Sequence, residues 1–345
     1  MKVVFSRCES YSDVKEALKE VVDRLGGIER FVRKGERVLV KPNLLSPHTP
    51  EHAVTTHPDF VRAVCELIEE AGGKVIIGDS PGMQGIGEEL FERTGIKDLG
   101  YPCVLFDKER TILKNGWLLT SVLEKVDRII NLPKLKTHTL TTLTLGVKNL
   151  YGLIPGVTKK KLHTKYPDPF SFSHMLLELY FLVKPDLTLL DGIWGMEGNG
   201  PSAGNPVRPG IVAGSPSALA LDVEVAKRTG AGGFPLKRIA ERKKILPSYT
   251  VEGDFRFRLK LPGKRWYHLL PSWAGHILSR LYRVKPGILP EKCTGCGICM
   301  RNCPAGAIEI KDTARINYSR CIGCMSCQEL CPFGAIVPVY GLIKR

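Results

Sequence analysis

Two runs of cysteines near the end of the chain have residue types and a spacing suited to metal chemistry. They read CTGCGICMRNCP from Cys293 and CIGCMSCQELCP from Cys321. Both follow the pattern CxxCxxCxxxCP, and each continues to a Gly-Ala-Ile tripeptide. Two residues between successive ligands let three thiolates converge on one centre from a tight loop. The proline then fixes φ where the chain leaves that loop.

This repeated spacing is typical of bacterial ferredoxins with two 4Fe-4S clusters, in which the fourth cysteine of each run binds the other cluster. The predicted ligands of one cluster are Cys293, Cys296, Cys299 and Cys331. The predicted ligands of the second are Cys321, Cys324, Cys327 and Cys303. The alternatives are a disulfide framework or zinc sites. The two registered copies, with no histidine in either run, favour iron–sulfur clusters.

The chain has 345 residues, which is enough for two domains, and its apolar fraction of 43% is ordinary for a globular protein. We predict a large domain over residues 1–254, a basic-aromatic connector over 255–286 and the two-cluster domain over 287–345. The remaining cysteines, Cys8, Cys65 and Cys103, are scattered and are interpreted as reduced packing residues. This usage predicts a reducing, cytoplasmic setting.

The first residues, MKVVFSRC, lack the apolar core of a signal peptide. No apolar run reaches the ~18–20 residues of a membrane span. We therefore expect a soluble or peripheral protein without a transmembrane segment.

The formal net charge is +15, and basic residues gather around Lys159–Lys165 and between Lys237 and Arg283. No nucleic-acid motif accompanies either patch, which argues against a nucleic-acid partner. A solvated surface, or a dock for an anionic partner, is the favoured interpretation. Residues 255–285 mix bases with aromatics, so they either pack the two modules together or lie on a membrane surface. We favour the connector.

Predicted strands and helices alternate over residues 1–254. We expect helices over 14–25, from Pro58 to the glycines at 72–73, over 86–94 and over 216–228. Asp13 is expected to cap the first helix and Ser215 the last. Strands are expected over 37–41, 74–78, 102–106, 126–131, 186–191 and 210–213. The alternation predicts an α/β fold, a large parallel-sheet layered domain, followed by a small ferredoxin-like α+β domain.

Polar motifs follow several of these strands. In open α/β sheets, ligands bind outside the carboxyl ends of the strands, so we expect one shared crevice. The alternative is that each loop only turns the chain. The residues predicted to bind a cofactor or substrate are Lys41, Asn43, Asp79, Ser80, Lys134, Lys148, Asn149 and His163.

Two further stretches suggest a catalytic pocket. Residues 131–163 combine lysines, histidines and threonines with glycines that allow close backbone approach, and 191–201 add two carboxylates on a glycine-rich loop. Lys134, Lys136, Lys148 and His163 are predicted to bind a carboxylate or phosphate. The predicted catalytic residues are Lys136, His138, Asp191 and Glu197, of which His138 moves a proton and the acids orient the bases or bind a metal. His138 taken alone would more often be a structural residue.

The stretches KPNLL, GDSPG, NLPKLKTHTLTTLTLGVKNLYGLIPG and LLDGIWGMEGNGP resemble the domain-of-unknown-function family 362. That family often carries a C-terminal two-cluster ferredoxin module, so the resemblance implies the fold, although it implies little about function. GVKNLYGLIPG and the following KLH are also similar to nickel-dependent lactate racemases. That resemblance implies a cofactor anchor at Lys148 and a nickel ligand at His163.

We therefore predict an iron–sulfur protein that passes low-potential electrons to an anionic substrate or cofactor in the large domain. One alternative is a non-enzymatic electron carrier or accessory protein. The other is a racemase- or isomerase-like enzyme with structural clusters. The expected partner is a redox protein or an anionic small molecule. No flavin or nicotinamide motif names the electron donor or acceptor, and the sequence names neither a substrate nor an oligomeric state.

Overall fold

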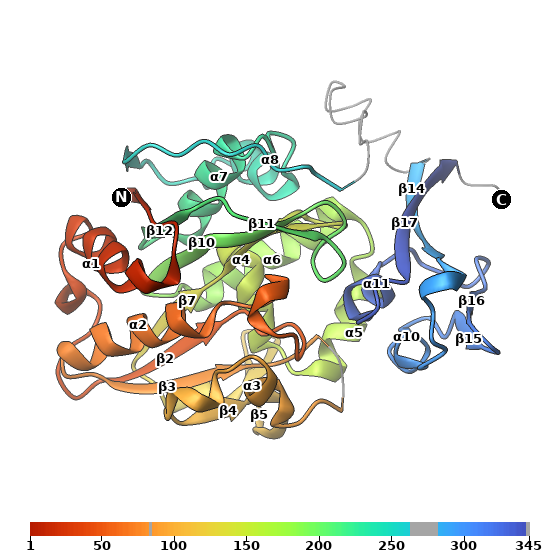
Figure 1. Ribbon diagram of the computed structural model, residues 1–345, viewed down its shortest axis with the longest axis horizontal. Coiled ribbons are helices and arrows are strands. Elements are labelled where there is room, and N and C mark those ends of the chain that lie inside the picture. Colours follow the sequence, from red (N-terminus) through yellow and green to blue (C-terminus); the bar gives the residue numbers. More distant parts are fainter. Residues whose placement is uncertain (83–84, 263–281, 343–345) are drawn as a thin grey trace.

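The computed structural model describes residues 1–82, 85–262 and 282–342. Figure 1 shows a large α/β domain and a smaller C-terminal module beside it. The α/β architecture and the ferredoxin-like C-terminal module are both as predicted from the sequence.

The large domain is built on a mostly parallel, 11-stranded sheet. Its main strand order is β13-β1-β12-β10-β7-β2-β3-β4, with β8 and β11 paired to β10, and β9 paired to β8. The pairs β1–β12, β10–β12, β10–β11 and β8–β9 are antiparallel, and the other pairs are parallel. The strands are β1 (Lys2–Arg7), β2 (Arg37–Pro42), β3 (Lys74–Asp79), β4 (Cys103–Leu105), β7 (Arg128–Leu132), β8 (Lys134–His138), β9 (Thr142–Thr144), β10 (Leu187–Glu197), β11 (Asn205–Val207), β12 (Ile211–Ser215) and β13 (Thr250–Glu252). A separate hairpin is formed by β5 (Thr111–Lys114) and β6 (Trp117–Thr120).

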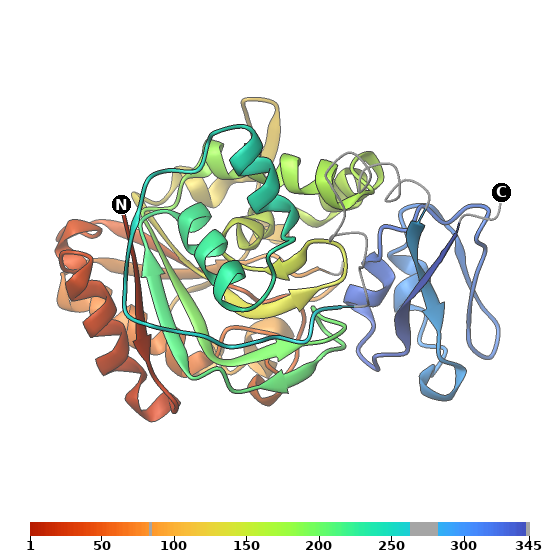
Figure 2. The same ribbon diagram turned by 90° about the horizontal axis from the view of Figure 1, so that it is seen from above.

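Helices cover both faces of this sheet, as Figure 2 shows. Strand β2 illustrates why. Its side chains alternate between faces, so Val38 and Val40 enter one core with α1 and α2, whereas Leu39 enters the other with α6, α7 and α8. The helices are α1 (Val14–Arg24), α2 (Pro58–Glu70), α3 (Glu89–Arg93), α4 (Gly146–Asn149), α5 (Gly156–Lys165), α6 (Pro169–Val183), α7 (Ala218–Arg228) and α8 (Pro235–Arg242).

The predicted elements are present, with some corrections at their ends. Helix α2 begins at Pro58, where the missing N–H costs nothing, and the His57 ring accepts a hydrogen bond from the Asp59 amide. Helix α7 is capped by Ser217, not by Ser215, and Asp13 makes no side-chain cap on α1. Helix α3 is shorter than predicted because it starts only at Glu89.

The C-terminal module contains two small antiparallel sheets and two short helices. One sheet pairs β14 (Tyr282–Ile288) with β17 (Ile336–Leu342), and the other pairs β15 (Ile308–Ile310) with β16 (Ala314–Ile316). Helix α10 (Ile298–Arg301) follows Gly297 at φ 75°, and α11 (Ser326–Leu330) follows Met325 at φ 60°. The two cysteine runs thus repeat in backbone conformation as well as in sequence.

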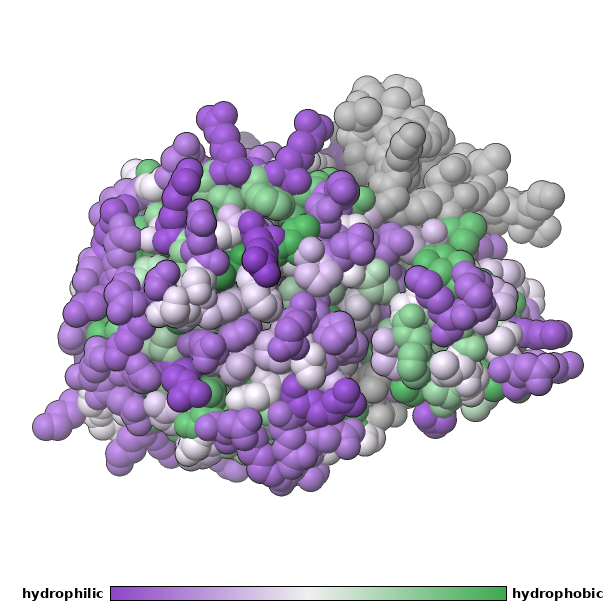
Figure 3. Space-filling view, in the orientation of Figure 1, coloured by the Kyte–Doolittle hydropathy of each residue, from purple (hydrophilic) through white to green (hydrophobic). Residues whose placement is uncertain are grey.

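The surface in Figure 3 is mainly hydrophilic, with smaller apolar patches on both the large domain and the C-terminal module. Phe255 and Leu259, at the start of the predicted connector, are buried against the large domain. Most of that connector, residues 263–281, lies outside the described residues, and with it most of the predicted membrane-binding segment. Among the residues that the structure describes, no helix is long and apolar enough to cross a membrane.

Candidate functional site

The cysteines of the C-terminal module gather around two small cavities of about 20 Å³ each. In each cavity, three cysteines from one run meet the fourth cysteine of the other. The first cavity is lined by Cys293, Cys296, Cys299 and Cys331. The second is lined by Cys321, Cys324, Cys327 and Cys303. These are the two interleaved sets that the repeat predicts.

The walls of both cavities suit an iron–sulfur cluster. Besides cysteines, they consist mainly of glycine, alanine, proline and aliphatic side chains. The amides of Ala314, Ala307 and Ala335 each donate to a cysteine sulfur at 3.3 Å, and such bonds tune cluster potentials. Burial raises the pKa of the Cys299 thiol to about 11, so without a metal this side chain is a neutral thiol. A bound cluster would hold it as the thiolate.

Helix α11 joins the cysteine cavities to the large domain. It lies between the two modules in Figure 1, and its sequence places Gln328 and Glu329 between Cys327 and Cys331. Gln328 bonds to the Thr139 hydroxyl and donates from Nε2 to the Asn199 carbonyl at 2.7 Å. The helix therefore carries Cys327 and ends directly before Cys331, one ligand of each predicted cluster, while Gln328, Glu329 and Leu330 are buried.

Glu329 extends from α11 to His138 at the end of β8. Its Oε1 lies 2.8 Å from His138 Nε2, and both side chains are at least nine-tenths buried. His138 Nδ1 accepts hydrogen bonds from the Leu140 and Thr141 amides, so the ring proton belongs on Nε2, facing the carboxylate. Burial lowers the pKa of His138 to about 4, which makes it a neutral donor at pH 7.

A polar cavity of about 70 Å³, here called the chamber, lies between the two modules. Both modules contribute to its wall. The large domain supplies Asn43, Leu45, Asp79, Ser80, Gly82, Thr144, Lys148, Asn149, Tyr151, Gly152, Lys159 and His163. The C-terminal module supplies Asn302, Ser326, Glu329 and Leu330.

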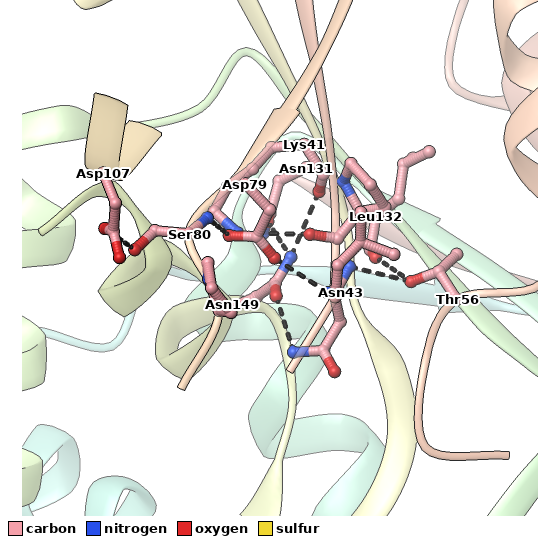
Figure 4. A network of polar contacts seen from close by, with 12 residues as sticks. Lys41, Asn43, Thr56, Asp79, Ser80, Asp107, Asn131, Leu132 and Asn149 are labelled. Carbon is pink, nitrogen blue, oxygen red and sulfur yellow. Dashed lines mark hydrogen bonds and ion pairs between the residues drawn. The ribbon is translucent and has the colours of Figure 1, made fainter. Parts of the chain in front are cut away.

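One side of the chamber is a closed hydrogen-bond network, shown in Figure 4. Lys41 Nζ donates to Asp79 Oδ1 at 2.8 Å, and the Leu44 amide donates to Asp79 Oδ2 at 2.7 Å. Gly152 packs so closely here that a Cβ would come within 2.1 Å of Asp79 Oδ1. The ion pair is therefore fully engaged, and this position accommodates only glycine.

Three asparagines extend the same network. Asn149 Nδ2 donates to the Asn131 Oδ1 atom at 2.9 Å and to the Lys41 carbonyl at 3.2 Å, while its Oδ1 accepts from Asn43 Nδ2 at 2.9 Å. Asn43 Oδ1, in contrast, is buried without a hydrogen-bond partner. The network thus ends at the chamber with one free acceptor.

Lys159 belongs to the basic patch interpreted as a solvated surface or a dock for an anionic partner, and for this residue the solvated surface is wrong. The side chain is buried, and its Nζ donates to the Ser80 hydroxyl at 2.7 Å and to the Ser80 and Pro81 carbonyls. Burial lowers its pKa to about 8. Ser80 in turn donates to Asp107. Lys159 therefore faces into the chamber wall and not towards solvent.

Lys148 and His163 complete the basic side of the chamber. Among the described residues, the Lys148 ammonium has no hydrogen-bond or ion-pair partner; the centroid of the Tyr151 ring lies 6.0 Å away. His163 stacks on Phe172 with 4.7 Å between ring centroids, and its Nδ1 has no partner. Burial lowers the pKa of Lys148, and it lowers that of His163 to about 4.

Other predicted site residues lie outside the chamber wall. Lys134 Nζ pairs with Asp191 at 2.7 Å and also bonds to the Tyr11 hydroxyl, which donates to Asp191. Lys136 Nζ donates to the Val54 carbonyl at 2.6 Å. Asp191 therefore pairs with Lys134 and not with His138, so it does not orient the His138 ring.

Glu197 is also separate from the chamber wall. Its Oε2 accepts from the Lys260 amide at 2.9 Å, and its Oε1 lies 3.5 Å from the Lys260 ammonium. It therefore attaches the beginning of the predicted connector to β10. Outside the two cysteine cavities, no three His, Cys, Asp or Glu side chains of the described residues are grouped to hold a metal ion.

Ten of the 16 residues that line the chamber were not predicted as site residues, among them Thr144, Tyr151, Lys159 and Glu329. The first three fall in or beside the stretch at 131–163, whose polar composition was a usable signal. Glu329 had no comparable signal, because a glutamate on a short helix between cysteines is normally exposed.

Comparisons with known proteins agree with both modules. The model of a domain of unknown function, DUF362, matches residues 38–227, and that of a 4Fe-4S dicluster domain matches residues 292–335. The thylakoid-associated protein sll1697 of Synechocystis sp. is 40% identical over 226 residues, covering 63% of this chain and 70% of that protein. A solved loganic acid methyltransferase with SAH aligns at 11% identity over 85% of this chain and 75% of its own, with a TM-score of only 0.24. The chain belongs to the DUF362 family and carries a C-terminal 4Fe-4S dicluster domain.

Proposed function

We propose that the protein binds two 4Fe-4S clusters and passes low-potential electrons to an anionic substrate or cofactor held in the chamber. The observation that carries this proposal is α11. Its flanking cysteines belong to the two cysteine cavities, while Glu329 reaches His138 and lines the chamber. Electron carriers and acceptors fused in this way meet without a second diffusional encounter.

The ligand sets follow from the two cavities. Cys293, Cys296, Cys299 and Cys331 would hold one cluster, and Cys321, Cys324, Cys327 and Cys303 the other. When bound, the clusters supply one-electron chemistry. Each group contains two buried cysteines, but only the first contains an exposed one, Cys296. We therefore assign electron entry to the first group and delivery towards the chamber to the second.

The side chains of the chamber have distinct roles in this proposal. Lys148 binds the anionic group, because it carries an ammonium without a partner of its own in the described structure. His138 is not part of the chamber wall; its neutral ring donates the Nε2 hydrogen bond to Glu329 and fixes that carboxylate at the chamber. Burial of the site by α11 excludes water, which strengthens each of these charge interactions.

The decisive experiment is anaerobic purification, followed by iron and sulfide analysis and mass spectrometry of released ligands. We expect about eight irons per chain from two 4Fe-4S clusters. Cys303→Ser and Cys331→Ser should each lose one cluster, from different groups, whereas Cys8→Ser should lose none. Iron-free protein that stays colourless after anoxic reconstitution would contradict the proposal.

The ligand site is tested separately from the clusters. Lys148→Met and His138→Gln should keep the full iron content and lose the anionic ligand or the turnover that depends on it. If both variants retain ligand and activity, the chamber is not the site. Nickel in the purified protein would instead favour the racemase- or isomerase-like alternative, since Lys148 and His163 both line the chamber.

A second candidate is an electron carrier or accessory protein without catalysis of its own. It is favoured by the apolar residues exposed on the C-terminal module, which include Met300, Tyr318, Phe333 and Val339. A redox partner protein would bind there. Two reversible low-potential couples without any small molecule in the chamber would support this candidate over an enzyme.

We also propose a cytoplasmic protein that contacts a membrane surface. The support is the name of the thylakoid-associated relative, together with the basic-aromatic composition of residues 255–286. Flotation with anionic liposomes tests this. Protein that stays at the bottom of the gradient would contradict the membrane contact.

A further inference from the structure

We infer that the chamber takes a small hydroxy-carboxylate, a monoanion that also donates a hydrogen bond of its own. This inference rests on the proposed function and specifies the class of ligand at the same site. Three observations carry it: where unpartnered polar atoms gather, how the buried charges balance, and how large the cavity is.

Unpartnered buried polar atoms concentrate at the chamber. Seven such atoms are found among the described residues, but two of them, His138 Nε2 and Glu329 Oε1, face each other at 2.8 Å. Of the other five, three belong to residues in the chamber wall: Asn43 Oδ1, Thr144 Oγ1 and His163 Nδ1. A buried polar group without a partner is costly, so native structures have few of them. Their concentration around one cavity indicates that a polar ligand completes them.

The chemistry of these atoms requires a ligand with both acceptors and donors. Lys148 only donates. Asn43 Oδ1 only accepts, because its amide nitrogen is engaged by Asn149, and the Glu329 carboxylate also only accepts. A simple carboxylate such as acetate would satisfy Lys148 and leave the Asn43 acceptor unpaired. A hydroxyl on the same molecule supplies the missing donor.

The balance of charge favours a net monoanion over a zwitterion. Lys41 is neutralised by Asp79. Lys148 and Lys159 also line the chamber, where Lys159 donates only to neutral groups, and Glu329 is the one further carboxylate of the wall. One positive charge is therefore in excess beside a buried cavity. A hydroxy acid would neutralise it, whereas an amino acid would not.

The size of the cavity limits the ligand. About 70 Å³ corresponds to about five water-sized positions, at roughly 10–15 Å³ for each. Glycolate, with five non-hydrogen atoms, is therefore a suitable probe. Acetate differs from it by the hydroxyl alone, and glycine replaces that hydroxyl by an ammonium group.

The test is anaerobic calorimetric titration of the full-length protein with glycolate, acetate and glycine. We expect glycolate to bind about tenfold more tightly than acetate, the effect of one good hydrogen bond at a buried site. Glycine should bind more weakly than either. Thr144→Val should weaken glycolate binding about threefold to tenfold. Thr55→Val is the matched control, since Thr55 is also buried with an unpartnered hydroxyl but does not line the chamber.

The outcomes separate this inference from the proposed function. If glycolate and acetate bind with equal affinity, the ligand needs no hydrogen-bond donor, although the chamber still binds an anion. If Thr144→Val and Thr55→Val change glycolate binding equally, glycolate does not bind in the chamber. If neither anion binds, and Lys148→Met changes nothing, the chamber holds water only and both proposals are wrong.

Discussion

The large domain buries lysines in two contrasting settings. Lys41 and Lys134 each have a carboxylate within 2.8 Å, and the neighbouring amides and hydroxyls complete those carboxylates. Lys148 lies near Glu329 but has no hydrogen bond or ion pair among the described residues. Lys41 and Lys134 and their carboxylates lie within the large domain. Lys148 lies at the chamber between the two modules and lacks a hydrogen-bonded partner there. Incomplete polar burial is expected at binding sites, because a ligand supplies the remaining partners.

The largest effect on stability should follow from removing the carboxylate that pairs with a buried lysine. Asp191→Asn removes the counter-ion of Lys134 and an acceptor of the Tyr11 hydroxyl. We expect a loss of about 3–5 kcal/mol in the free energy of unfolding, since a buried charge is left uncompensated. Anaerobic urea denaturation followed by circular dichroism measures this. If the variant is as stable as the wild-type protein and lacks only turnover, Asp191 is a catalytic residue. The contrast between the ion-paired lysines and Lys148 would then be wrong.

These two settings also show what the sequence could predict. The cysteine ligands were predictable because cluster chemistry requires their spacing. Lys41, Asn43, Asp79 and Ser80 were predictable because polar residues at the ends of neighbouring parallel strands must meet. The strand and helix alternation predicted the sheet for the same reason, although not the antiparallel pairing of β12.

Other features depend on contacts that no local pattern encodes. Asp191 and Glu197 stand beside a glycine-rich loop, yet nothing in the sequence indicates that Lys134 and Lys260 are their partners. Lys159 lies in a basic run, and only the docking of α5 buries it. Glu329 reaches His138 across nearly two hundred residues, so its role follows from the packing of the modules alone.

A smaller effect is expected from pH. Burial lowers the pKa of His163 to about 4, from an ordinary value of 6.5, in a site shared with Lys148, Lys159 and Glu329. The unfolded chain therefore binds a proton that the folded protein excludes, and stability falls as the pH drops from 6.5 towards 4. We expect His163 to account for a loss of about 2 kcal/mol between pH 7 and pH 5.

His163→Gln should flatten this dependence by about the same amount. Denaturation curves at pH 7, 6 and 5 compare the variant with the wild-type protein. Parallel curves for the two proteins would show that His163 is accessible to protons in the folded state. That result would remove one of the buried groups that distinguish the chamber.

The smallest effect on stability should come from Lys148→Met. Lys148 is only partly buried and has no hydrogen-bonded partner in the described structure, so its removal relieves little desolvation and leaves only Glu329 less compensated. We expect a change within about 1 kcal/mol in either direction. The same denaturation assay used for Asp191→Asn checks it. A loss as large as that of Asp191→Asn would mean that Lys148 is a structural residue.

The central claim is that the C-terminal module completes the chamber through Glu329, close to the clusters. Redox titration monitored by electron paramagnetic resonance tests it most directly, in wild-type protein and in Glu329→Gln. Removing a buried negative charge beside the cluster ligands should raise at least one of the two reduction potentials, while Glu309→Gln, at an exposed position of the same module, should leave both unchanged. Potentials that are identical in all three proteins would contradict the account.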